Sequence, residues 1–173
     1  MSEEEKKTNR RDFLFTASYT LGAVGIGSII WPLVHQMNPD KAQQALATTE
    51  VDISQVEPGK SITVLWRGKP VFLKRRTEKE IKEARAVALK DLPDPQKDEE
   101  RVKEGKDEWL VMVGVCTHLG CVPLKDKGDF NGWFCPCHGS HYDVSGRVRK
   151  GPAPKNMEIP KYEFVDSNII KIG

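Results

Sequence analysis

Hydrophobic and polar positions divide the chain into one long apolar run and a later region where short apolar segments alternate with polar loops. Residues 13–34 carry no charge, and a helix of that length would measure roughly 33 Å at 1.5 Å per residue. That length is sufficient to cross a bilayer. The pattern predicts a transmembrane anchor at residues 13–37, preceded by a polar N-terminus at 1–12.

The stretch after the anchor, residues 38–50, is polar and alanine-rich and has little to bury. Such a composition is typical of a linker, so we interpret it as a flexible hinge or neck. Within it, Ala45-Leu46-Ala47 has the small-x-small form of a signal-peptidase site. A cleaved, soluble product is therefore an alternative to a permanent anchor.

Short apolar runs predict a mainly β domain over residues 51–173. Two runs, 61–66 and 70–74, lie on either side of Arg67-Gly68-Lys69, which is a plausible hairpin turn. Asp52 begins the loop that leads into this hairpin. Further strands are expected at 109–115, 132–134, 162–165 and 168–172.

A highly charged segment at 75–108 interrupts these strands. Thr77 and Glu80 form a capping-box pattern, and we expect a helix from there to Leu89, before Pro93 and Pro95 end the helical pattern. Taken alone, the segment is a solvated helix and loop with no catalytic signal.

Composition changes this picture little. The chain has 173 residues, of which 38% are hydrophobic and 30% charged, and its formal net charge is +2. These values fit one domain of moderate size. The small net charge gives no signature of nucleic-acid binding.

The chemistry is concentrated in two boxes, C-T-H-L-G-C and C-P-C-H-G-S-H, which hold all four cysteines and three of the four histidines. Each box supplies a thiolate and an imidazole, ligands that soft or borderline metals prefer. Cys121 and Cys137 remain as a second pair, whose natural use is a disulfide between the boxes. The candidate metal ligands are Cys116, His118, Cys135 and His138.

Other uses of these residues are open. Two cysteines and two histidines also make a structural zinc site, but zinc fingers usually place their histidines on a helix. Gly120, Pro123, Pro136 and Gly139 exclude a helix here. A module with two disulfides would leave the histidines without a role, and a reduced, unliganded core fits poorly with cysteine-rich glycine loops.

The boxes resemble those of the Rieske iron-sulfur proteins, in which two imidazoles replace two thiolates on one iron of a [2Fe-2S] cluster. The resemblance implies one cluster per chain, with Cys116 and Cys135 on one iron and His118 and His138 on the other. Two ferric ions, two sulfides and two thiolates sum to zero charge. Such a site should accept an electron more readily than one with four thiolates.

The resemblance also assigns residues around the cluster. It implies a disulfide between Cys121 and Cys137, and hydroxyls at Ser140 and Tyr142 that donate to cluster or ligand sulfur and raise the potential. The G-P-A-P segment at 151–154 resembles the proline loop that shields the cluster from one side. The implied fold is an antiparallel β-sandwich with a small cluster-binding subdomain at about 115–155 and one helix-loop insertion.

Mitochondrial and proteobacterial members of the family carry an insertion similar to 75–108. The resemblance therefore implies the iron-sulfur subunit of a quinol:cytochrome c oxidoreductase, which works with a cytochrome b subunit and a membrane-bound c-type cytochrome. In such a complex His138 would take a proton from ubiquinol as the cluster takes one electron, a step that contributes to proton translocation. Leu119 resembles an apolar residue of the docking surface.

The alternative function is that of a Rieske-type ferredoxin, which carries electrons to an oxygenase without binding quinol. Such carriers generally lack the second cysteine pair, the membrane helix and the charged insertion. All three features are present in this sequence.

Arg10-Arg11, just before the apolar run, resembles the twin-arginine signal that exports folded proteins. This signal suits a domain whose cluster is assembled before export. A basic flank that obeys the positive-inside rule is the simpler interpretation, and both place the N-terminus in the cytoplasm. We therefore expect a single-pass protein of the bacterial inner membrane with a periplasmic cluster domain.

Overall fold

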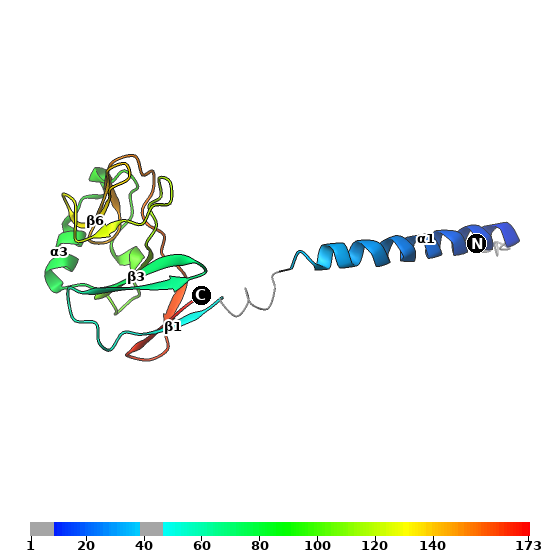
Figure 1. Cartoon of the computed structure of the whole chain (residues 1–173), viewed down its shortest axis with the longest axis horizontal. Helices are drawn as coiled ribbons and strands as arrows, with labels where there is room; N and C mark the ends of the chain where they lie inside the picture. Colours follow the sequence, from blue (N-terminus) through cyan, green and yellow to red (C-terminus); the bar gives the residue numbers. More distant parts are fainter. Residues whose placement is uncertain (1–8, 39–46) are drawn as a thin grey trace, which may run out of the picture. The chain divides into compact units, whose positions relative to one another are not determined.

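A computed structural model of the chain describes residues 9–38 and 47–173 (Figure 1). The chain divides into two compact units, Met1–Gln44 and Ala45–Gly173. Most of the predicted hinge at 38–50 lies outside the described residues, as do Ala45 and Leu46 of the small-x-small site and residues 1–8 of the N-terminus.

The first unit contains the helix α1, Arg10–His35. It is the one helix in the described part of the chain that is long and apolar enough to cross a membrane, and none of its apolar stretch is buried. The hydroxyls of Thr16 and Thr20 donate to carbonyl oxygens one turn earlier, each at 2.8 Å. Such internal bonds satisfy polar groups where water is absent, so α1 fits the predicted anchor.

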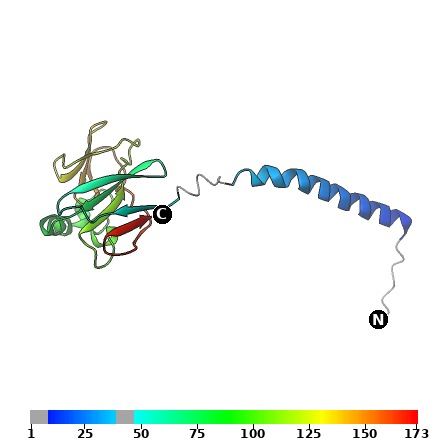
Figure 2. The same cartoon turned by 60° about the horizontal axis from the view of Figure 1, so that its bottom comes forward.

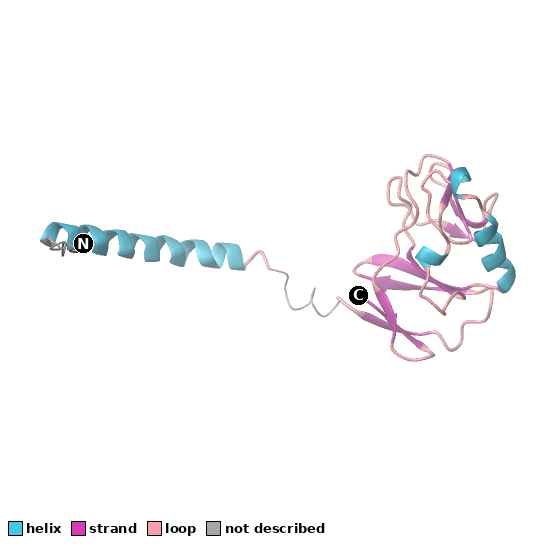
Figure 3. Ribbon diagram, turned by 180° about the vertical axis from the view of Figure 1, so that it is seen from behind, coloured by secondary structure: helices cyan, strands magenta, loops and turns pink. Residues whose placement is uncertain are grey.

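The second unit is built from three small antiparallel sheets, which confirms the prediction of a mainly β domain (Figure 3). The first sheet has the order β1 Thr49–Asp52, β10 Ile169–Ile172, β9 Tyr162–Phe164. The second has the order β2 Ser61–Trp66, β3 Lys69–Arg75, β4 Trp109–Val113. The third has the order β5 Leu124–Lys125, β6 Asn131–Cys135, β7 Ser140–Asp143, β8 Val148–Lys150.

The predicted hairpin forms as expected. Trp66 pairs with Lys69, which leaves Arg67 and Gly68 as a two-residue turn with φ values of +50° and +73°. Positive φ at both positions is the requirement of a type I′ turn, which matches the twist of the two strands.

Strand β1 was not predicted, because Val51 is its single apolar residue and its first two residues belong to the polar stretch predicted as the hinge. Val51 pairs with Ile170 of β10, and this partner is far away in the sequence. Figure 2 shows the cyan start of the domain beside the red C-terminal strand. The ordered domain thus includes Thr49 and Glu50.

Two hydrophobic cores lie on opposite faces of the sheet that contains β3 and β4. Val71, Leu73 and Val111 pack in the first core with the sheet of β1, β10 and β9. Phe72 and Met112 point to the opposite side, into a second core. Burial on both faces explains why β4 is apolar throughout. The second core also holds Cys116 and Cys135 of the two boxes, together with Trp133 and Tyr142.

The charged segment differs from the prediction. Its helix, α3 Glu78–Ala86, starts at the expected cap, where the Thr77 hydroxyl accepts from the Glu80 N–H. It ends before Leu89, which lies in a separate 3₁₀ turn, η1 Leu89–Asp91. The carbonyl of Ala84, which a longer helix would pair with residue 88, accepts from Arg147 at 2.6 Å instead.

The same segment is not simply solvated. Arg76 and Asp98 are buried, as is Arg101 at the end of the short turn η2 Glu99–Arg101. Buried charges require paired hydrogen-bonding partners. Arg76 and Asp98 pair with each other, and Asp98 and Arg101 are also bonded to Ser145, which lies in the turn after β7. The segment is therefore part of the domain's interior framework.

Candidate metal centre

The two boxes fold into matching turns. The carbonyl of Cys116 accepts from the N–H of Gly120 at 2.9 Å, and that of Cys135 accepts from the N–H of Gly139 at 3.0 Å. Both glycines have positive φ, +84° and +74°, where a side chain would be strained. The equal cysteine-to-glycine spacing therefore shapes two equivalent loops.

A disulfide joins the loops. Cys121 and Cys137 are bonded across a sequence separation of 16 residues, as predicted. Cys116 and Cys135 remain free thiols, and both are buried. The sulfur of Cys135 lies within 4.8 Å of both disulfide sulfurs. Those two sulfurs are already bonded to each other, so this trio is not a ligand set.

The predicted histidine ligands face each other. The rings of His118 and His138, one from each loop, have centroids 4.7 Å apart and lie nearly perpendicular at 84°. Nδ1 of His118 is buried with no hydrogen-bond partner among the residues that the structure describes. An unpaired buried nitrogen is costly, so this atom is suited to bind a metal. His138 is exposed at the surface.

Tyr142 sets the electrostatics of one thiol. Its hydroxyl donates to Sγ of Cys116 at 3.2 Å and accepts from the N–H of Thr117, also at 3.2 Å. Burial acts to raise the pKa of Cys116, but hydrogen bonds, with Tyr142 first, outweigh it and lower the pKa. Burial raises the pKa of Tyr142 to about 12, so the phenol keeps its proton and remains a donor.

The second thiol lies in a different environment. Burial raises the pKa of Cys135 above its ordinary value, with the neighbouring Cys116 acting in the same direction. Nearby backbone N–H groups of Cys137 and His138 oppose this effect. Two thiols this close disfavour simultaneous ionisation, and a bound cation would relieve that repulsion.

A third loop closes the site. Ser140 is buried, and its hydroxyl accepts from the N–H of Ala153 at 3.2 Å. The hydroxyl of Thr117 donates to the carbonyl of Lys155 at 2.6 Å. A side chain on Gly151, whose φ is +98°, would collide with the backbone of Gly139. The G-P-A-P loop thus packs on the second box, and Lys155, which follows it, is bonded to the first. That the loop shields the cluster stays a prediction.

Comparisons with known proteins agree with this geometry. Residues 48–163 match the family described as the Rieske [2Fe-2S] domain. The chain belongs to the Rieske iron-sulfur family. Residues 1–40 match a second family, described as the ubiquinol-cytochrome c reductase Fe-S subunit TAT signal.

Two bacterial relatives of this Rieske protein align over nearly their whole length. The ubiquinol-cytochrome c reductase iron-sulfur subunit of Rhodospirillum rubrum is 56% identical over 172 residues, which are 96% of this chain and 93% of the relative. That of Rickettsia prowazekii is 52% identical over 170 residues, which are 98% and 96%. A solved structure titled hyperthermophilic respiratory Complex III is 32% identical, with a TM-score of 0.53, covering 90% of this chain and 97% of that one.

The Rieske-type [2Fe-2S] cluster is the cofactor of this domain, and the residues present fit it. Two free buried thiols and two facing imidazoles supply the donors that such a cluster requires. Sequence reasoning missed Thr117 as a supporting residue, although it lies inside the first box. Its contacts to Tyr142 and Lys155 depend on partners more than 20 residues away, which no local pattern shows.

We expect Tyr142→Phe to lower the midpoint potential and leave the cluster in place, because it removes only the hydroxyl that donates to Cys116. A net hydrogen bond of about 1 kcal/mol corresponds to about 40 mV in a one-electron couple. A redox titration followed by electron paramagnetic resonance would measure the shift. Tyr162→Phe is the matched control, since Tyr162 is buried in the first core. Equal potentials in wild type and Tyr142→Phe would contradict the role.

Proposed function

We propose that this chain is the iron-sulfur subunit of a quinol:cytochrome c oxidoreductase, which takes one electron and a proton from ubiquinol and passes the electron to a c-type cytochrome. The observation that carries the proposal is the pair of facing imidazoles next to two free buried thiols, with one imidazole exposed. The names of the relatives and of the structural neighbour support it.

In this proposal Cys116, His118, Cys135 and His138 would hold the [2Fe-2S] cluster, which supplies reversible one-electron transfer when bound. The four side chains divide into two classes. The thiols are buried and removed from water, whereas the ring of His138 is exposed. An imidazole at the surface can accept a hydrogen bond and a proton from a quinol hydroxyl.

The surface around His138 supports a docking role. Leu119 in the first box is 69% exposed, and Val122 is 52% exposed. Apolar side chains that a folded domain leaves in water mark surfaces that other molecules cover. We assign this surface to the cytochrome b and membrane-bound c-type cytochrome subunits, with Leu119 as a contact residue.

For the anchor, α1 would cross the bacterial inner membrane once, with the N-terminus in the cytoplasm and the Rieske domain in the periplasm. Arg10 and Arg11 occupy the first turn of α1, which agrees with a positive cytoplasmic flank. The oxygenase ferredoxin is the less favoured alternative, because α1, the disulfide and the insertion are all present.

The test is an electron paramagnetic resonance spectrum of the membrane-extracted protein, reduced in parallel with ascorbate and with dithionite. We expect a rhombic [2Fe-2S] signal that is already complete with ascorbate, because a site with two imidazole ligands accepts electrons from mild donors. A signal that needs dithionite would favour the low-potential ferredoxin. The lack of a signal with both reductants would contradict the cluster.

A further inference from the structure

The charged insertion is bonded to the strand that carries Tyr142. The guanidinium of Arg147 donates to the Asp143 carboxylate at 2.8 Å. It also donates to two backbone carbonyls of the insertion, that of Ala84 at 2.6 Å and that of Gln96 at 3.2 Å. The Arg147 side chain is 1% exposed. Asp143 directly follows Tyr142 in β7, so one buried side chain connects the insertion to the tyrosine's strand.

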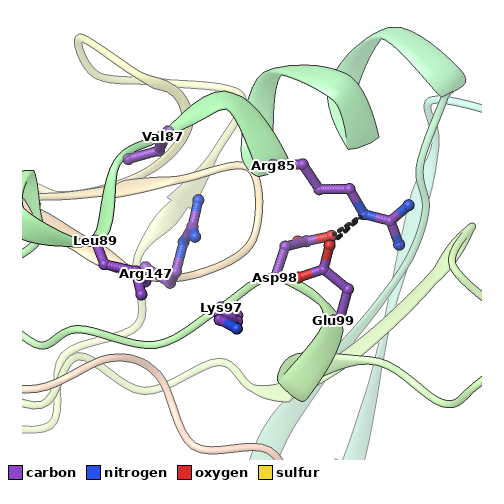
Figure 4. A pocket seen from close by; sticks show the side chains of 7 residues that line it. All are labelled: Arg85, Val87, Leu89, Lys97, Asp98, Glu99 and Arg147. Atoms are coloured by element: carbon purple, nitrogen blue, oxygen red, sulfur yellow. Dashed lines mark ion pairs between the residues drawn. The ribbon is translucent and has the colours of Figure 1, made fainter.

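A second set of bonds holds the same turn between β7 and β8. Asp98 of the insertion pairs with Arg76 at 2.5 Å and accepts from the Ser145 hydroxyl. Arg101 donates to the Ser145 carbonyl at 2.7 Å. Figure 4 shows Arg147 and Asp98 lining one pocket, where Asp98 and Glu99 pair with Arg85. The insertion therefore holds the turn at two positions, Ser145 and Arg147.

Hydrogen bonds within the turn also fix its shape. The Asp143 carboxylate accepts from the backbone N–H groups of Ser145 and Arg147, at 2.9 and 3.0 Å. Hydrogen bonds weaken steeply as distance and angle depart from the optimum. A small displacement of β7 would therefore weaken the 3.2 Å contact between the Tyr142 hydroxyl and Sγ of Cys116.

We propose that the insertion is a positioning element for the redox centre: through Arg147 it fixes Asp143 and so keeps the Tyr142 hydroxyl on the Cys116 sulfur. This inference rests on the proposed function, in which Cys116 is a ligand and Tyr142 raises the potential. Stability alone accounts poorly for the arrangement, because buried ion pairs often contribute little more than apolar packing would.

The test is Arg147→Lys in the full chain. Lysine keeps the positive charge and can still pair with Asp143, but its single ammonium lacks the planar fork that serves several acceptors. We expect a lower midpoint potential at full cluster content, with a shift no larger than that of Tyr142→Phe. In the double variant we expect no shift beyond that of Tyr142→Phe alone, because Arg147 acts through Tyr142.

Arg149→Lys is the matched control. Arg149 lies on the same strand, β8, where its guanidinium stacks over the ring of Phe130 at 4.4 Å. The substitution also keeps the charge, and we expect an unchanged potential. A potential in Arg147→Lys equal to that of wild type would overturn the inference and leave the Tyr142 assignment standing. The inference would also be overturned if the shift in potential of the double variant equalled the sum of the shifts of Arg147→Lys and Tyr142→Phe.

The design separates this inference from the proposal on which it rests. If Tyr142→Phe itself leaves the potential unchanged, this inference fails together with the role of Tyr142, whereas the proposed function fails only if ascorbate does not reduce the cluster. Should Arg147→Lys lose the cluster, Ser145→Ala tests the same turn with a smaller change, because it removes only the hydroxyl that donates to Asp98. We expect Ser145→Ala to lower the midpoint potential in the wild-type background and to cause no further shift in the Tyr142→Phe background. An unchanged potential in Ser145→Ala alone would overturn the inference.

Discussion

Replacing His138 by glutamine should remove the rhombic [2Fe-2S] signal and, with it, quinol oxidation. The substitution takes away one of two facing imidazoles, and a neutral amide is a much poorer ligand for iron. Removing a residue that only hydrogen-bonds to a metal ligand typically lowers metal affinity 10–100-fold. Removing a ligand itself should therefore lower cluster content by more than about tenfold. Quantitative electron paramagnetic resonance and iron analysis of the extracted protein would measure it.

His141→Gln is the control for this variant. His141 lies three residues further on, yet its Nδ1 accepts from the N–H of Asp129 at 3.0 Å and its ring packs on Phe134 at 4.8 Å. We expect the signal to survive there. A fully active His138→Gln would contradict the ligand assignment, and equal losses in both variants would indicate a general effect on folding.

The second large effect concerns the disulfide. Replacing Cys121 and Cys137 together by serine should lower the free energy of unfolding by about 3 kcal/mol, because a closed loop of about sixteen residues restricts the unfolded chain by roughly that amount. The midpoint of thermal unfolding should fall by about 10 °C. The two ligand loops would also lose their direct covalent tie, so we expect faster loss of the cluster on heating.

Reductant provides the control within the same experiment. Dithiothreitol should bring the wild-type unfolding midpoint down to that of the double variant, and it should leave the variant unchanged. Equal midpoints for wild type and variant without reductant would show that the bond contributes nothing to stability.

Local signals made part of the fold predictable. The hairpin of β2 and β3 depends on Arg67 and Gly68, which lie within the segment they shape. The anchor depends on a continuous apolar run. The disulfide partners were predictable since the boxes leave only Cys121 and Cys137 unused. The ligand roles of the other four side chains remain a prediction, although the structure brings the two imidazoles together.

Features that depend on distant partners were not predictable. Strand β1 exists because Val51 meets Ile170, and helix α3 stops early where Ala84 is bonded to Arg147. A charged segment such as 75–108 resembles a solvated surface in the sequence. Three of the acceptors of Arg101 are the carbonyls of Ser145, Gly146 and Met157, more than 40 residues further along the chain, and no pattern within the segment indicates them.

Asp98 gives the domain a tolerance of acid. Burial acts to raise the pKa of Asp98, but hydrogen bonds and charge from Arg76 outweigh it and hold the pKa below the ordinary value of 3.8. The stabilisation from this lowered pKa is complete above that value and is lost only as the pH falls through the still lower folded pKa. Mildly acidic solution should therefore leave this contribution intact, since its loss is confined to pH values below 3.8. The turn between β7 and β8, which Asp98 holds through Ser145, should keep its place over the same range.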